Sequence, residues 1–143
     1  AAVFNSARRF HPGFRPRGPS IFLRGPVIKL LNKASQKTLV ENLEVAGSLW
    51  TRTRGLLGRQ DLPTNQGLWI LRCNNIHTFF MKFALDLIFL NKKMVVTKTV
   101  KNVRPGRIVW AWNASSVIEL KTGFLDRNPV HVGEELHVDP SLS

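Results

Sequence analysis

Four side chains with chemical potential stand in or beside apolar segments of this sequence. Cys73 and His77 lie four positions apart in the stretch CNNIHTFFMKFALDLIFLN, and Asp86 follows in the same stretch. Glu119 interrupts a later apolar run, SVIELK. A thiolate activated by a histidine and oriented by a carboxylate would make a nucleophilic relay. The same four residues could instead line a pocket that binds a small molecule.

The spacing of Cys73 and His77 argues against a relay. In an extended strand they would be about 13 Å apart, from a rise of about 3.3 Å per residue, which is beyond hydrogen-bond reach unless Asn74 and Asn75 turn. A metal site is also disfavoured, because Cys73, His77 and Met81 on one strand cannot surround an ion alone. We predict no catalytic residue, no metal ligand and no cofactor, and keep the ligand pocket as the alternative.

Asp86 and Glu119 also have a structural interpretation. A carboxylate in an apolar segment must be paired or hydrogen-bonded, because an isolated buried charge is costly. Arg54, Arg59 and Lys82 are the candidate partners, and such ion pairs would fasten a helix to a sheet. The alternative is that the two acids form part of a polar ligand pocket.

The segments that must position these residues have the pattern of short strands. Residues 38–47 alternate between apolar and polar side chains, and Ser48 as N-cap begins one predicted helix that ends by Pro63. Seven further segments are rich in β-branched or aromatic residues and are bounded by turn residues. They are GLWILRC, HTFFMKF, LDLIFLN, MVVTKTVKNV, RIVWAWN, SSVIELKTG and EELHVD. This pattern predicts a mainly β sandwich or barrel with one packed helix.

The aromatic residues are expected mostly in the core. Phe79 and Phe89 lie in predicted strands and are expected to face the interior, so their truncation should unfold the domain. Trp110 and Trp112 share one face of a predicted strand. They would offer a stacking surface if that face is exposed.

The positive charge is concentrated near the start of the chain. The formal net charge of the 143 residues is +12, and eight of the 21 basic residues precede Glu41, the first acid. Residues 1–38 combine arginine, phenylalanine and proline, which predicts an extended basic arm before a compact β domain in residues 39–143. Such an arm is either a tail or transit remnant, or a nucleic-acid contact. The expected contacts are Arg8, Arg9, Arg15, Arg17, Arg24 and Lys29.

Cysteine content and hydropathy bear on the compartment. Cys73 is the only cysteine, which excludes an intrachain disulfide and fits a reducing environment. No apolar run reaches the roughly 18 residues of a membrane span, so we expect no membrane insertion. The expected location is intracellular, with the mitochondrial matrix favoured over a bacterial cytoplasm.

Several motifs in order resemble one known family. LWTRTRGLLGR, GLWIL, CNNIHTFFMKFALDLIFLN, MVV, SSVIELKTG and VGEEL are similar to the domain of unknown function 192 (DUF192) family over about residues 42–139. The resemblance implies a compact fold of jelly-roll type with one packed helix, and no established activity. Two departures stand out: Ala84 replaces the usual proline, and Glu134 and Glu135 replace a Gly-Asp pair. They suggest that any pocket chemistry of the family is relaxed here.

Together these features favour an interaction protein over an enzyme. We predict a non-catalytic structural or interaction subunit of a large assembly, with a ribosome-type ribonucleoprotein favoured. Residues 1–40 would bind RNA or an acidic surface, and the β domain would contact protein neighbours. The alternative is a small-molecule-binding or hydrolytic domain with a pocket around Cys73, His77, Asp86 and Glu119.

Overall fold

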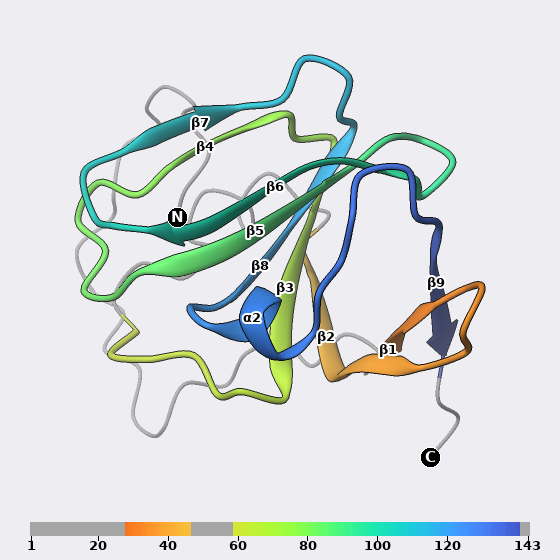
Figure 1. The fold of residues 1–143 in the computed structure, drawn as a ribbon. Coiled ribbons are helices and arrows are strands. Elements are labelled where there is room, and N and C mark those ends of the chain that lie inside the picture. Colours follow the sequence, from red (N-terminus) through yellow and green to blue (C-terminus); the bar gives the residue numbers. More distant parts are fainter. Residues whose placement is uncertain (1–27, 47–58, 141–143) are drawn as a thin grey trace, which may run out of the picture.

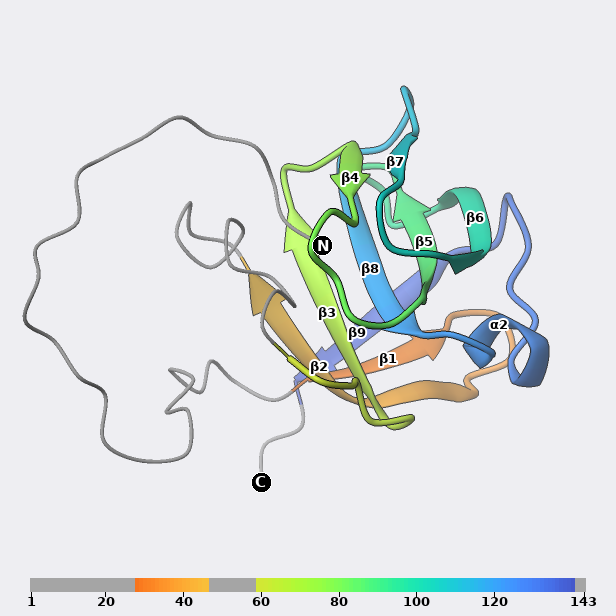
Figure 2. The ribbon, with the colours of Figure 1, turned by 90° about the vertical axis from the view of Figure 1, so that its left-hand side faces the viewer.

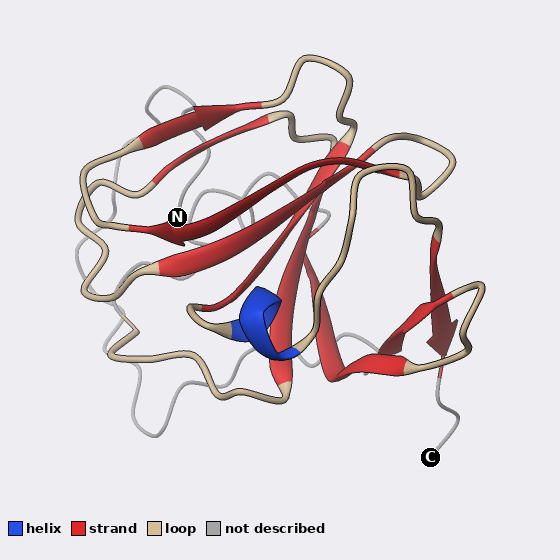
Figure 3. Ribbon diagram, in the orientation of Figure 1, coloured by secondary structure: helices blue, strands red, loops and turns tan. Residues whose placement is uncertain are grey.

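The mainly β class predicted from the sequence is confirmed. The computed structural model describes residues 28–46 and 59–140, and within these ranges it contains nine strands and one short helix (Figures 1 and 3). The elements are β1 (Ile28–Asn32), β2 (Thr38–Ala46), β3 (Gln66–Leu71), β4 (Asn75–His77), β5 (Leu85–Leu90), β6 (Val96–Val103), β7 (Ile108–Trp110), β8 (Ser116–Lys121), α2 (Phe124–Arg127) and β9 (Leu136–Pro140).

Seven strands form one sheet in the order β6-β5-β8-β3-β2-β1-β9. All neighbours are antiparallel except β2 and β3, which run parallel. The strand direction changes across the sheet, so that β5 and β6 run in a different direction from β9 in Figure 1 and the sheet curls into an open half-barrel. A separate ribbon of β4 and β7 lies beside β5 and β6 (Figures 1 and 2).

The central strands are apolar on both faces because the sheet is covered on both sides. All six residues of β5 are buried. Leu87 and Phe89 join one core cluster, which also contains Ile76 and Met81 from the ribbon side. Ile88, on the opposite face, joins a second cluster that includes α2 and β1. The side-chain period of two residues thus assigns each position of β5 to one of two cores.

Some sequence predictions need correction, and others concern residues outside the described ranges. Residues 28–38, assigned to the arm, instead form β1 and the turn that follows, and Leu30 is completely buried. Residues 77–83 do not form a strand, because β4 ends at His77. The predicted helix at residues 48–63 lies mostly outside the described residues, as does the rest of the arm, while α2 was not anticipated.

Candidate functional site

The two-stranded ribbon presents one face to solvent. Asn75 pairs with Trp110, and His77 pairs with Ile108, so these four side chains share one face. Ile108 is 47% exposed and Trp110 is 49% exposed. The alternate position in β4, Ile76, is completely buried in the core. The ribbon therefore closes the core with one face and shows apolar side chains to solvent with the other.

The loop after β4 extends this exposed face. Phe79 is 40% exposed and stacks on the His77 ring, with 5.3 Å between ring centroids. Phe80 is 88% exposed and has a backbone φ of 64°. The left-handed region is costly for a bulky residue, and no burial of the Phe80 ring offsets that cost. Strained, exposed residues of this kind cluster at functional sites, so we take Phe80 as a marker of one.

Thr78 holds the neighbouring turn against this loop. Its side chain is fully buried, and its hydroxyl donates to the carbonyl of Arg104 at 2.7 Å and accepts the backbone N–H of Arg107 at 2.9 Å. The Thr78 carbonyl accepts the N–H of Gly106 at 3.0 Å. The exposed side chains of Arg104 and Arg107 are thus carried on a turn that is fixed beside the aromatic loop.

We name this region the ribbon surface, and its charge is strongly positive. Its apolar members are Phe79, Phe80, Ile108 and Trp110, and its cations are Lys82, Arg104 and Arg107. Residues 72–118 contain eight lysines and arginines and a single acid, Asp86. Asp86 is only 1% exposed, and its carboxylate accepts two backbone N–H groups. The ribbon surface combines exposed rings with the exposed cations Lys82, Arg104 and Arg107.

The Cys73 thiol and the His77 imidazole have different surroundings in the structure. Cys73 is 5% exposed, and its thiol donates to the carbonyl of Asn75 at 2.9 Å. His77 points to the outer face of the ribbon, and its Nδ1 has no hydrogen-bond partner among the described residues. Burial lowers the pKa of the His77 imidazole below its usual 6.5. The thiol is directed to a backbone carbonyl rather than to a base, so the geometry does not build a relay.

Among the described residues Asp86 is held by backbone N–H groups and not by Arg59 or Lys82, while Arg54, the third expected partner, lies outside those residues. Its carboxylate accepts the backbone N–H of Asn102 at 2.8 Å and that of Leu125 at 2.9 Å. Leu125 lies in the first turn of α2, whose N-cap, Gly123, has no side chain to offer. Asp86 therefore caps this helix from β5 and ties it to β6.

Glu119 lies on the opposite face of the sheet from Asp86. It is completely buried and pairs with Leu68 and Leu87, which belong to the core cluster on the ribbon side. Burial raises the pKa of the Glu119 carboxyl, and the positive charge of Arg59 opposes this rise. The guanidinium of Arg59 donates to Glu44 at 2.9 Å. Arg59 was a predicted partner of Glu119, and it acts there through its charge.

The four predicted pocket residues consequently do not line one pocket. Asp86 faces α2, Glu119 faces the other core, Cys73 is buried, and His77 faces outward. Within the described ranges no group of three or more metal-ligating side chains is assembled. The same ranges contain no helix long and apolar enough to cross a membrane.

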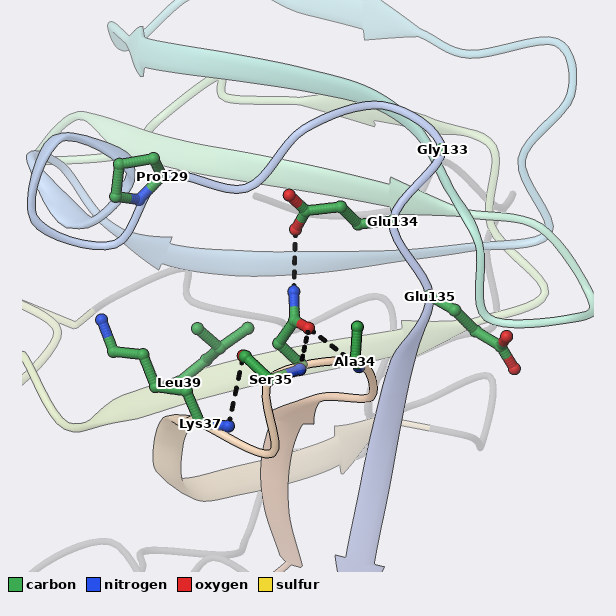
Figure 4. Close-up of a pocket in the computed structure, with 9 residues that line it drawn as sticks. Ala34, Ser35, Lys37, Leu39, Pro129, Gly133, Glu134 and Glu135 are labelled. Carbon is green, nitrogen blue, oxygen red and sulfur yellow. Dashed lines mark hydrogen bonds between the residues drawn. The ribbon is translucent and has the colours of Figure 1, made fainter.

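A hollow of about 500 Å³ lies instead between the β1–β2 turn and the segment before β9 (Figure 4). Glu134 accepts a hydrogen bond from the amide of Asn32 at 2.8 Å, and Glu135 pairs with Lys33 at 2.6 Å. The two glutamates that depart from the family pattern thus link the two walls of this hollow. Lys29, expected on nucleic acid, faces Glu41 at 3.4 Å.

With this geometry in place, comparisons with known proteins identify the family. The family model DUF192, described as an uncharacterised protein family, matches residues 30–138. This protein belongs to the DUF192 family. The UPF0127 protein of Thermococcus sibiricus is 31% identical over 114 residues, which cover 75% of this chain and 72% of that protein.

Two crystal structures share the fold of this DUF192 protein. One, a protein of unknown function from Novosphingobium aromaticivorans, has a TM-score of 0.67 and 19% identity over 78% of this chain and 83% of its own. The other, a Sinorhizobium meliloti protein provisionally described as a transcription regulator, has a TM-score of 0.68 and 22% identity over 78% of this chain and 91% of its own. At these identities the likeness establishes the fold alone.

The prediction that Phe79 faces the core is wrong, and Trp110, expected mostly in the core, is also substantially exposed. The alternative kept from the sequence, a stacking surface at Trp110 and Trp112, agrees with the exposure of both residues. Phe80 and Ile108 were not expected to join it. One signal was available: residues 87–118 contain no acid at all. A long acid-free stretch that carries two tryptophans, here Trp110 and Trp112, is typical of a surface for a polyanion.

Proposed function

We propose that this DUF192 protein is a non-catalytic RNA-binding component of a ribonucleoprotein assembly, with the ribbon surface as a contact of its β domain. The observation that carries the proposal is the pair of exposed rings, Phe80 and Trp110, in residues 72–118, a basic part of the chain whose single acid is the buried Asp86. Phe80 and Trp110 offer rings to unpaired bases, and Arg104 and Arg107 offer charge to phosphates. Stacking on aromatic rings combined with cationic contacts is how proteins bind single strands without reading sequence.

The arm adds an electrostatic contact in this proposal. Arg8, Arg9, Arg15, Arg17 and Arg24 lie outside the described residues, so their contribution rests on composition. A ribosome-type assembly and a mitochondrial location also rest on that composition. The related proteins named above are archaeal and bacterial, and this origin favours the alternative location, a bacterial cytoplasm.

Binding of a fluorescent single-stranded RNA, followed by anisotropy over a range of salt concentrations, tests the proposal. The double substitution Arg104→Gln and Arg107→Gln should weaken binding and reduce the salt slope by about 1.4, from about 0.7 per phosphate contact on single strands. Phe80→Ser should weaken binding at every salt concentration, because it removes a stacking ring without changing charge.

Matched controls come from residues outside the ribbon surface. Val132 is 65% exposed and apolar, and Lys37 is exposed and basic, so Val132→Ser and Lys37→Gln repeat the chemistry of the test substitutions elsewhere. Neither control should change affinity by more than a small factor. Equal effects at the ribbon and at the controls would refute a localised RNA contact. Binding to anionic vesicles but not to RNA would assign the ribbon surface to lipid instead.

A further inference from the structure

A second group of exposed residues lies just beyond the end of the ribbon. The turn between β5 and β6 and the turn before β8 flank a hollow of about 350 Å³. Trp112, which is 85% exposed, lines this hollow together with Lys92 and Lys93, and no acidic residue contributes to it. We name it the turn hollow; its other lining residues are Asn91, Asn113, Ala114 and Ser115.

The β5–β6 turn is held in shape before any ligand arrives. The Asn91 side chain accepts the backbone N–H of Lys93 at 2.9 Å and that of Val95 at 3.0 Å. The Met94 N–H donates to the Asn91 carbonyl at 3.0 Å, and Met94 has a left-handed φ of 61°. Asn91 thus fixes the backbone that carries Lys92 and Lys93, which lowers the ordering cost of a phosphate contact.

The other wall of the hollow, residues 112–115, is anchored to Leu90 at the end of β5. The N–H of Ser115 donates to the carbonyl of Leu90 at 2.7 Å, and the N–H of Ala114 donates to that of Ala111 at 2.9 Å. The N–H of Ala111 in turn donates to Asn74 at 2.9 Å, which continues the pairing of the ribbon. Trp112 therefore stands on a braced turn, next to the ribbon surface and opposite two lysines.

We propose that the turn hollow is a subsite for one nucleotide of a single-stranded RNA, with its base on Trp112 and an adjoining phosphate on Lys92 and Lys93. The inference rests on the proposed function and extends its binding path beyond Trp110. An exposed indole is a good platform for any base, and two lysines on one turn suit a phosphate. The hollow is open to solvent, and an open hollow lets a chain enter and leave, as a polymer requires.

Crosslinking with the full-length protein tests this placement. A single-stranded RNA of about 10 nucleotides, within the usual site sizes, carries 4-thiouridine at one position and is irradiated on the protein. Tandem mass spectrometry of the digest should localise a crosslink to Trp112 itself, as distinct from Trp110 in the same peptide. Crosslinks confined to residues 1–40 or to the ribbon surface would overturn the subsite.

Affinities of variants provide the second readout. Trp112→Ala should lower RNA affinity by about five-fold or more, whereas Trp112→Phe should retain most of it because the ring remains. The double substitution Lys92→Gln and Lys93→Gln should reduce the salt slope by about 1.4. Lys37→Gln serves as the control, since Lys37 is a turn lysine at the other hollow.

The outcomes separate the subsite from the proposed function. If Arg104→Gln with Arg107→Gln weakens binding but Trp112→Ala leaves it unchanged, the subsite is wrong and the RNA-binding function stands. If Phe and Ala at position 112 weaken binding equally, stacking is refuted. If the unaltered protein binds no RNA, the proposed function and the subsite fail together.

Discussion

Replacement of Asp86 by alanine should be among the most destabilising single changes in this fold. The carboxylate accepts two backbone N–H groups, from Asn102 at 2.8 Å and from Leu125 at 2.9 Å, and it is 1% exposed. Asp86→Ala leaves both donors without this acceptor. Leu125 is itself buried, so water cannot readily take the place of the carboxylate there.

The size of the effect follows from these two contacts. A buried donor left unsatisfied costs about 1–3 kcal/mol, and loss of the second bond, which is nearer to solvent, costs about 1 kcal/mol. We expect Asp86→Ala to lower the free energy of unfolding by about 2–4 kcal/mol, a large share of the usual 5–15 kcal/mol. At an m-value of about 2 kcal/mol per molar urea, the unfolding midpoint should fall by about 1–2 M.

Urea unfolding followed by circular dichroism measures this shift, and two further variants sharpen it. Asp86→Asn keeps one acceptor oxygen but sets an amide donor against the second N–H. Its loss of unfolding free energy should therefore approach that of Asp86→Ala. Asp126→Asn removes a carboxylate that meets Lys101 on the exposed surface, and it should leave the midpoint nearly unchanged. A loss below about 1 kcal/mol for Asp86→Ala would refute the capping role of this carboxylate.

Three other predictions follow from burial. Phe89→Ala should cost about 3–5 kcal/mol in thermal or urea unfolding because Phe89 is completely buried, while Phe79→Ala should cost much less. The buried Cys73 thiol should react with a thiol reagent only when the protein unfolds, and rapid labelling of the native protein would contradict its burial. Because burial raises the pKa of Glu119 above 4.5, the folded state holds this proton more tightly than the unfolded chain, and stability should fall as pH rises above that value. Urea midpoints from about pH 4 to about pH 8 should show this fall in the unaltered protein and lose it in Glu119→Gln.

The sequence predicted strands well where both the pattern and the backbone are regular. β2, predicted from its alternation, ends at Ala46, one residue before the predicted stop at Gly47. Residues 77–83 were predicted as a strand from their β-branched and aromatic residues, yet the chain leaves the strand after His77 because the Thr78 hydroxyl bonds the 104–107 turn and Phe80 turns left-handed. A contact 26 positions away, between Thr78 and Arg104, decides this local structure, and no window of neighbouring residues contains it.

The partners of buried acids were harder still to predict. The sequence predicts cationic partners for these acids because a cation is recognisable from its residue type. Asp86 instead found backbone N–H groups 16 and 39 positions away, and almost every residue carries such a donor. β1 was not predicted because its short apolar run follows a strongly basic segment. The composition of residues 1–38 as a whole hides a strand of five residues. For both features, only the fold reveals which groups meet.

The alternation of the ribbon separates the residues that hold the fold from the residues that we propose bind RNA. Ile76 and Thr78 point inward, where one fills the core and the other holds the 104–107 turn, and both are completely buried. His77 and Phe79 point outward from the same backbone, and the ring of Phe80 beyond them contributes little to the core because it is 88% exposed. Folding alone gives no reason for an aromatic residue there, since glycine would adopt the same φ without strain. An exposed aromatic ring at that backbone cost therefore favours a role in contact with a partner.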